Sequence, residues 1–293
     1  MRRREILRGG LAATAAAALG PRPVAGTEVR ARVVVVRVAD RQDGVRRALA
    51  MLGPAAVGGK HVVLKPNLNS ADPFPGSTHP DTLAALVDWL GRAGATGVTV
   101  ADRSGMGVTR EVMEATGVFA QGRRLGFAAT PLDELPAREW VAHELPGGDW
   151  RRGVLFPRLL EEAEAIVSTC CLKTHRFGGQ ITLSLKNSVG MVAKHGPDGY
   201  NYMTELHRSA AQLRMIAELN RLYRPAAVLL DGLEAFVRGG PEAGTRVAPG
   251  VIIAGTDRVA IDAVGVAVLR LYDTTPEVAA GPIFQQPQLK RAA

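Results

Sequence analysis

Polar residues close each of four strand-like apolar runs, and this feature constrains the fold more than any other. The runs are "HVVLK" (61–65), "TGVTVAD" (96–102), "AEAIVSTCCLK" (163–173) and "PAAVLLDG" (225–232). Patterns with helical spacing separate them, and strands that alternate with helices pair in parallel in a covered sheet. We therefore predict an α/β fold with Rossmann-like layering, in which a mostly parallel sheet carries helices on both faces.

Further patterns extend this alternation of strands and helices. We expect a strand at residues 32–39 and helices at 44–53 and 204–222. Another helix is expected to begin at His79-Pro80-Asp81, because proline suits the first helical turn and aspartate is favourable there. The pattern is hardest to interpret in residues 120–153, which we expect to be an insertion.

Composition and charge exclude several classes of protein. At 293 residues, 46% hydrophobic and 22% charged, the chain has enough apolar residues for a substantial core. Half of the formal net charge of +8 comes from residues 1–26, which hold five arginines and one glutamate. The remainder has no basic run interleaved with aromatic residues, so we predict that the protein binds no nucleic acid.

The first 26 residues differ from the rest of the chain. An arginine-rich start joins a weakly apolar stretch that is too short for a convincing membrane span. Within it, "RREILR" (3–8) resembles the twin-arginine export pattern. We predict a twin-arginine signal peptide at residues 1–26, the twin-arginine export machinery as a partner, and a periplasmic or extracellular protein. The alternative is an uncleaved anchor, and in either case only this segment contacts the membrane.

The chain has two cysteines, Cys170 and Cys171, which are adjacent. Neighbouring residues of a strand point to opposite faces, so at least one of them is expected in the core. The sequence contains neither a CxxC pair nor an HExxH motif. We therefore predict no iron–sulfur cluster and leave the presence of any other metal or cofactor open.

The polar residues that follow the predicted strands form the candidate site. In open α/β sheets, ligands bind outside the carboxyl ends of the strands. A lysine directly after a buried strand needs a partner, and we predict that this partner is a small anionic molecule. Proline and asparagine behind Lys65 fix the backbone and add a carboxamide suited to an anion. We expect substrate-binding roles for Lys65, Asn67, His79, Asp102, Ser104, Asn187 and Asp231.

Lys173, His175 and Lys186 are the candidate catalytic residues, all within "CLKTHRFGGQITLSLKNSVGM" (171–191). Lys173 and His175 are two residues apart, so they share a face of an extended segment. A lysine holds a carboxylate or phosphate as a point charge, or acts as a base where burial lowers its pKa. His175 is a candidate acid, base or ligand, with a purely structural role as the alternative.

The aspartates at strand ends have structural alternatives as well. Asp102 could contact a metal or substrate, or orient a lysine, and the Ser104-Gly105 turn behind it leaves N–H groups free to meet an anion. Asp231 precedes a glycine, a pair that is typical of a turn. Asp257 is expected to cap the last long helix.

Seven motifs, in order, resemble those of the family called domain of unknown function 362: "LKPNL", "THPDTLAALVDWL", "VADRSG", "LKTH", "LSLKNSVGM", "LLDGLEAF" and "GTDRVAIDAV". The resemblance implies a single α/β domain over residues 32–290. Some relatives carry ferredoxin-like clusters in a Cys-rich segment, which this sequence lacks. Relatives are also expected to continue for some residues beyond the final "QLKRAA".

Two functions from different classes fit these residues. The first is an enzyme that acts on a small anionic substrate by Lys/His acid–base chemistry, with a general layout similar to the lactate racemase type of α/β protein. The second is a non-catalytic exported protein that binds an anion or a cofactor. Lys186→Arg distinguishes them, because it preserves binding under the second function and abolishes turnover under the first.

Overall fold

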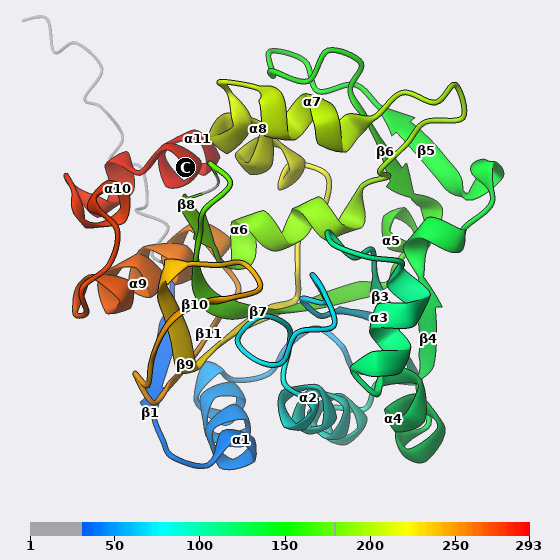
Figure 1. The fold of residues 1–293 in the computed structure, drawn as a ribbon. Coiled ribbons are helices and arrows are strands. Elements are labelled where there is room, and N and C mark those ends of the chain that lie inside the picture. The colour runs from blue at the N-terminus through cyan, green and yellow to red at the C-terminus, as the bar shows by residue number, and fades with distance from the viewer. Residues whose placement is uncertain (1–30, 179) are drawn as a thin grey trace, which may run out of the picture. The chain divides into compact units, whose positions relative to one another are not determined.

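The computed structural model describes residues 31–178 and 180–293, and the predicted signal at residues 1–26 lies outside the described residues. Strands and helices alternate along the described chain (Figure 1). The strands of the main sheet are β1 (Val33–Arg37), β2 (His61–Lys65), β3 (Gly97–Asp102), β4 (Ala128–Pro131), β7 (Ala165–His175), β8 (Gln180–Thr182), β9 (Ala227–Gly239), β10 (Gly244–Val247) and β11 (Val251–Gly255). A separate two-stranded sheet consists of β5 (Trp140–His143) and β6 (Val154–Pro157).

The main sheet is mixed, with most of its strands pointing the same way. Its order is β1-β11-β9-β7-β2-β3-β4, with β10 paired to β9 and β8 paired to β7. The five strands from β9 to β4 in this order pair in parallel. β11 runs antiparallel to both of its neighbours, β9 and β1. The predicted α/β fold with a mostly parallel sheet is therefore confirmed.

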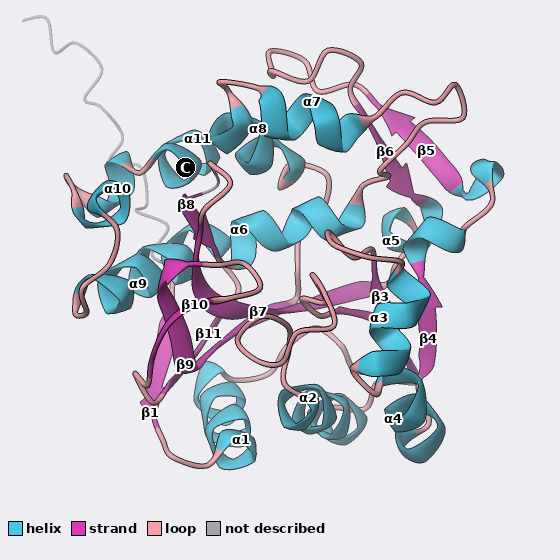
Figure 2. Cartoon of the chain, in the orientation of Figure 1, coloured by secondary structure: helices cyan, strands magenta, loops and turns pink. Residues whose placement is uncertain are grey.

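Helices cover both faces of the sheet, as Figure 2 shows. One side carries α1 (Arg41–Leu52), α2 (Pro80–Arg92), α3 (Thr109–Ala115) and α4 (Val118–Leu125). The remaining helices are α5 (Arg158–Glu161), α6 (Ser184–Asn187), α7 (Tyr202–Arg208), α8 (Gln212–Leu219), α9 (Arg258–Arg270), α10 (Pro276–Ala279) and α11 (Pro287–Ala292). Of these, α6, α8, α9 and α11 lie over the opposite face of the sheet. This arrangement is the layering predicted from the sequence.

Side-chain caps begin several of the helices. Asp257 accepts a hydrogen bond from the Ala260 backbone N–H at the start of α9, which confirms its predicted capping role. His79 caps α2 in the same way, with its ring nitrogen accepting from the Asp81 backbone N–H. The single helix predicted over residues 204–222 is wrong. Ser209 has an extended backbone there and separates α7 from α8.

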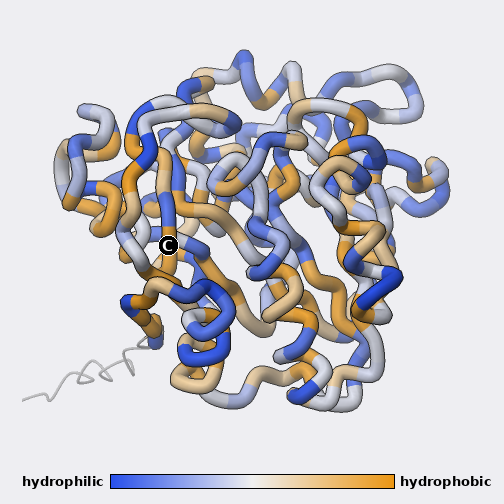
Figure 3. The backbone as a smooth tube through the Cα atoms, turned by 60° about the horizontal axis from the view of Figure 1, so that its bottom comes forward, coloured by the Kyte–Doolittle hydropathy of each residue, from blue (hydrophilic) through white to orange (hydrophobic). Residues whose placement is uncertain are grey.

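Apolar strand residues form the interior of the molecule. Val62, Leu64 and Val100 are completely buried under α1 and α2, and Val228 and Leu230 are buried under α9. Both cysteines are buried and free, which agrees with the prediction of a core position. Figure 3 shows hydrophobic colouring along the central strands and mostly hydrophilic colouring at the outer turns. No helix in the described part of the chain is long and apolar enough to cross a membrane.

Candidate functional site

A cavity of about 40 Å³ lies at the carboxyl ends of the parallel strands β2, β3 and β7. This volume holds a few water molecules or a small polyatomic group. Six of the residues predicted for the site line the cavity: Lys65, Asn67, Asp102, His175, Lys186 and Asn187. The rule that ligands bind beyond the carboxyl ends of strands thus identifies a real hollow in this fold.

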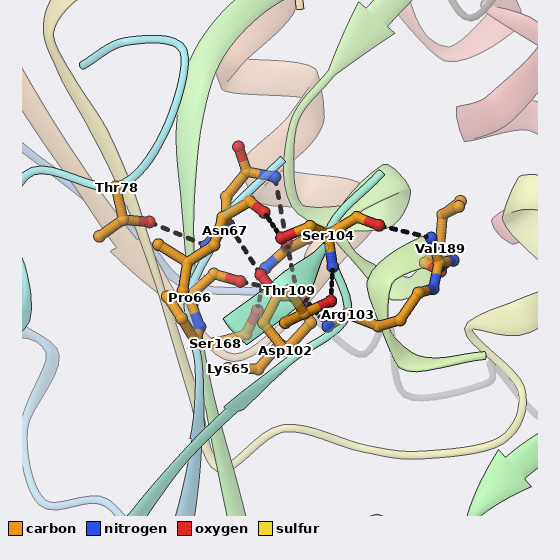
Figure 4. A network of polar contacts seen from close by, with 12 residues as sticks. Lys65, Pro66, Asn67, Thr78, Asp102, Arg103, Ser104, Thr109, Ser168 and Val189 are labelled. Carbon is orange, nitrogen blue, oxygen red and sulfur yellow. Dashed lines mark hydrogen bonds and ion pairs between the residues drawn. The ribbon is translucent and has the colours of Figure 1, made fainter. Parts of the chain in front are cut away.

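Lys65 and Asp102 form a buried ion pair in the wall of this cavity. The Lys65 Nζ lies 2.7 Å from Asp102 Oδ1, and both side chains are almost completely buried. The same ammonium also donates to the carbonyl of Pro66 and to Asn187 Oδ1. Burial lowers the Lys65 pKa, and the carboxylate of Asp102 opposes that shift. Lys65 therefore has a partner for each of its three donors (Figure 4).

Asp102 is equally well satisfied. Its Oδ2 accepts from the Leu68 backbone N–H at 2.7 Å, and its Oδ1 accepts from the Arg103 backbone N–H at 2.7 Å. Gly190 packs directly against this pair, since a Cβ at that position would lie 2.5 Å from Asp102 Oδ1. The chain can approach the ion pair this closely only because residue 190 has no side chain.

Lys186 lies on α6, which Asp262 of α9 holds at its first turn. The Asp262 carboxylate accepts from the backbone N–H groups of Ser184 and Leu185 and from the Ser184 hydroxyl. Burial raises the pKa of Asp262 to about 6, against the effect of these three donors. An acceptor from another helix thus satisfies the free N–H groups of this short helix, and α6 presents Lys186 to the cavity.

The Lys186 ammonium has no counter-charge among the described residues. The side chain is buried, and no described residue accepts a hydrogen bond from it or forms an ion pair with it. Burial, with Lys173 and Arg103 nearby, lowers its pKa to about 7. A buried cation with neither carboxylate nor acceptor is unfavourable by itself, so an anion placed beside it is favoured.

His175 ends β7 and faces the same cavity as Lys186. Its ring is buried, and its Nδ1 has no hydrogen-bond partner among the described residues. Burial and the positive charges of Lys186 and Lys173 hold the His175 pKa well below its ordinary value. The imidazole is therefore neutral at neutral pH, and the tautomer decides whether its Nδ1 donates or accepts a hydrogen bond.

Three polar side chains of the lining are not among the residues predicted from the sequence: Asn69, Arg103 and Thr182. Arg103 is completely buried, and its guanidinium donates to the backbone carbonyls of Val189 and Val192. Burial lowers its pKa to about 10. Arg103 directly follows the strand-end aspartate, so its position beside Asp102 could have identified it. Asn69 and Thr182 have no comparable signal, because polar residues of these types are common in turns and strands.

The structure does not bring four of the predicted residues into the cavity lining: Lys173, His79, Ser104 and Asp231. Lys173 is buried outside the cavity lining, and its ammonium donates to the backbone carbonyls of Gly76 and Pro241. The Ser104 hydroxyl donates to the Leu68 carbonyl. Asp231 accepts from Arg41, from the Thr82 hydroxyl and from the Leu233 backbone N–H. The turn predicted at Asp231 and Gly232 is wrong, because β9 continues through both residues to Gly239 and pairs there with β11.

Metal-binding clusters are absent from the described part of the chain. No three histidine, cysteine, aspartate or glutamate side chains come together there in a way that could hold an ion. Among the described residues that line the cavity, Asp102 is the one carboxylate, and it already binds Lys65. The donor set of this site therefore suits an anion better than a cation.

A family model described as "Domain of unknown function (DUF362)" matches residues 62–267. The lactate racemase apoprotein from Thermoanaerobacterium thermosaccharolyticum is 16% identical, with a TM-score of 0.49 over 78% of this chain and 55% of that chain. A structural-genomics protein from Thermotoga maritima is 16% identical, with a TM-score of 0.47 over 78% of this chain and 57% of that one. The chain thus spans little more than half the length of these two structures. No curated protein matches its sequence.

Proposed function

Because the chain belongs to the DUF362 family, whose name assigns no activity, we propose a function from the cavity itself: the protein binds a small anion, a carboxylate or a phosphate, with Lys186 as the binding cation. One observation carries the proposal. Lys186 is 8% exposed, yet no described residue forms an ion pair or a hydrogen bond with its ammonium group. An anion beside this ammonium replaces the hydration that burial removes.

The same cavity supplies groups for proton transfer. Lys186, with its pKa lowered to about 7, exists as both ammonium and amine near neutral pH, and His175 beside it is a neutral imidazole that can donate or accept a hydrogen bond. A pKa close to the working pH suits a general acid or base. Acid–base chemistry on the bound anion is therefore the catalytic form of this proposal, and reversible binding without chemistry is the alternative.

Calorimetric titration with small carboxylates and phosphate tests the binding. A bound anion raises the Lys186 pKa, so binding takes up protons between about pH 7 and pH 9, and the apparent enthalpy depends on the buffer. Lys186→Met is expected to weaken binding by about tenfold or more. Lys290→Met, at an exposed lysine, is the matched control. Equal affinities of Lys186→Met and wild type would refute the proposal.

Catalysis is tested with Lys186→Arg. An arginine keeps the positive charge but does not lose a proton in proteins, so it retains anion affinity and loses acid–base activity. The measurement is the exchange of solvent deuterium into a bound anion, followed by NMR. Exchange that persists in Lys186→Arg at the wild-type rate would show that Lys186 is not the acid–base group. A wild-type protein that binds the anion without any exchange would be assigned to the non-catalytic alternative.

Export is a separate part of the proposal and is supported by the sequence of residues 3–8. The double variant Arg3→Lys, Arg4→Lys is expected to retain the protein inside the cell, because the export pattern consists of these two arginines. Arg2→Lys, outside the pair, is the matched control. Fractionation and immunoblotting measure the outcome, and unchanged export of the double variant would exclude this route.

A further inference from the structure

The cavity contains a hydrogen-bond acceptor that a simple anion cannot satisfy. Asn67 is buried and lines the cavity, and its Oδ1 has no hydrogen-bond partner among the described residues. Asn69, His175 and Thr182 line the same cavity, and each has one buried atom without a partner there. Hydroxyl rotation, or the choice of tautomer, decides whether Thr182 and His175 donate or accept. The orientation of the Asn67 amide, in contrast, is fixed by its surroundings.

The chain of contacts that fixes it begins at Asn187. The Asn187 Nδ2 donates to the backbone carbonyl of Thr169 and to the Ser168 hydroxyl, each at 3.0 Å. Its Oδ1 accepts from Lys65 Nζ at 3.0 Å. If the amide were turned over, its oxygen would face the Thr169 carbonyl and its nitrogen would face the lysine. Both contacts would be repulsive, so the amide of Asn187 has one orientation.

The orientation of the Asn67 amide is fixed by its contact with the Asn187 amide. One of its amide atoms lies 3.4 Å from Asn187 Oδ1 and must be the nitrogen, since an oxygen there would face another oxygen. The Asn67 backbone N–H donates to the Thr78 hydroxyl, which holds the residue in place (Figure 4). The other amide atom, Oδ1, is therefore an acceptor, and a buried acceptor without a donor is costly.

We propose that the ligand of this cavity carries a hydrogen-bond donor beside its negative charge, so that its charge meets Lys186 and its donor meets Asn67 Oδ1. The inference rests on the proposed function and narrows it. Hydroxylated carboxylates and phosphates that retain an O–H group have this chemistry. Simple carboxylates and sulfate lack the donor, and their binding leaves the Asn67 oxygen unpaired.

Two matched pairs of anions test the proposal by calorimetric titration of the wild-type protein. Phosphate and sulfate have the same tetrahedral shape, but only phosphate retains a hydroxyl at neutral pH. Glycolate and propionate are nearly the same size, and only glycolate has a hydroxyl. The donor-bearing member of the pair that fits the cavity is expected to bind about tenfold tighter or more. The pair that shows this difference tells a phosphate ligand from a carboxylate.

Two asparagine variants assign the effect to a residue. Asn67→Leu, of similar volume but without an acceptor, is expected to reduce the preference to less than about threefold. Asn69→Leu removes a neighbouring amide of the same cavity whose orientation no described contact fixes, and it should weaken both members of a pair alike. A preference that persists in Asn67→Leu would overturn the assignment to this oxygen.

The outcomes separate this inference from the proposed function. If anions bind but neither pair shows a preference for its donor-bearing member, anion binding stands and the requirement for a donor is wrong. If none of the four anions binds, the proposed function fails and the inference fails with it. The wild-type comparison needs no variant, so it decides the question even if Asn67→Leu does not fold.

Discussion

Lys65 and Lys186 are two buried lysines in the wall of one cavity, and they differ in every contact of the ammonium group. Lys65 Nζ meets a carboxylate, a backbone carbonyl and an amide oxygen. Lys186 Nζ meets none of these within the described residues. Burial alone therefore does not identify a functional lysine. The distinguishing property is whether the fold itself provides the partner of the charge.

The surroundings of Lys186 show how a fold holds an unpaired cation in place. Asp262 binds the first turn of α6, and Arg103 binds carbonyls of the segment that follows α6. Both ends of the Lys186 segment are thus fixed by backbone contacts. The ammonium itself stays free for a ligand, as the first contacts of a binding site must be.

The largest change in stability is expected when Lys65 is replaced. Lys65→Met leaves Asp102 as a buried carboxylate without its cation, which is expected to lower the free energy of unfolding by about 3–5 kcal/mol. Urea denaturation followed by circular dichroism measures the change. A loss below 1 kcal/mol would mean that the pair contributes no more than a surface salt bridge.

The next largest effect on stability is expected at Gly190, which packs against the ion pair of Lys65 and Asp102. In Gly190→Ala the new Cβ would lie 2.5 Å from Asp102 Oδ1 and 2.9 Å from Lys65 Nζ. We expect a loss of about 2–3 kcal/mol in the free energy of unfolding, measured in the same way. Gly91→Ala in α2 is the control, because its Cβ meets no atom within 4 Å, and it is expected to stabilise the helix slightly. Similar losses in both variants would refute the packing argument.

Substitution of Lys186 is expected to change the free energy of unfolding in the opposite direction. Lys186→Met removes a buried cation without a partner, so at pH 7 the free energy of unfolding is expected to rise by about 1–3 kcal/mol. The same variant is expected to lose anion binding. Denaturation and calorimetric titration of one preparation measure both quantities. A loss of stability would show that Lys186, like Lys65, has a structural partner in the folded protein.

The sequence predicts much of the fold because strand-forming runs and helical spacing depend on local residues. It does not predict that β11 runs antiparallel, since an apolar run such as "GVIIAG" (250–255) has no direction of its own. Nor does it predict the break between α7 and α8, because the residues around Ser209 keep a helical spacing. The extended backbone of Ser209 is a feature of the folded chain.

The sequence also places most of the candidate site at strand ends, yet it does not distinguish the two lysines of the comparison. Lys65 and Lys186 have similar neighbours, since each follows a leucine and has an asparagine within the next two positions. Asp102 reaches Lys65 only because β2 and β3 pair in parallel and end at the same edge. Long-range strand pairing of this kind decides which lysine forms an ion pair, and no local sequence pattern encodes it.

The last prediction is a contribution to the pH dependence of stability that comes from Lys186. Its pKa is about 7 in the folded protein, against an ordinary value of 10.5. Between these pH values the unfolded chain binds more protons than the folded one, so stability rises with pH. Below about pH 7 both states are protonated, and above 10.5 both are neutral, so the contribution is constant outside this window.

Subtracting the free energy of unfolding of Lys186→Met from that of the wild type isolates this contribution, because the other titrating groups are common to both proteins. The difference is expected to rise with pH between about 7 and 10, by at most about 1.4 kcal/mol per pH unit. A saturating anion raises the Lys186 pKa and moves the rise to higher pH. If the difference in the free energy of unfolding does not change with pH across this window, the Lys186 ammonium has a partner in the folded protein. The contrast with Lys65 would then disappear.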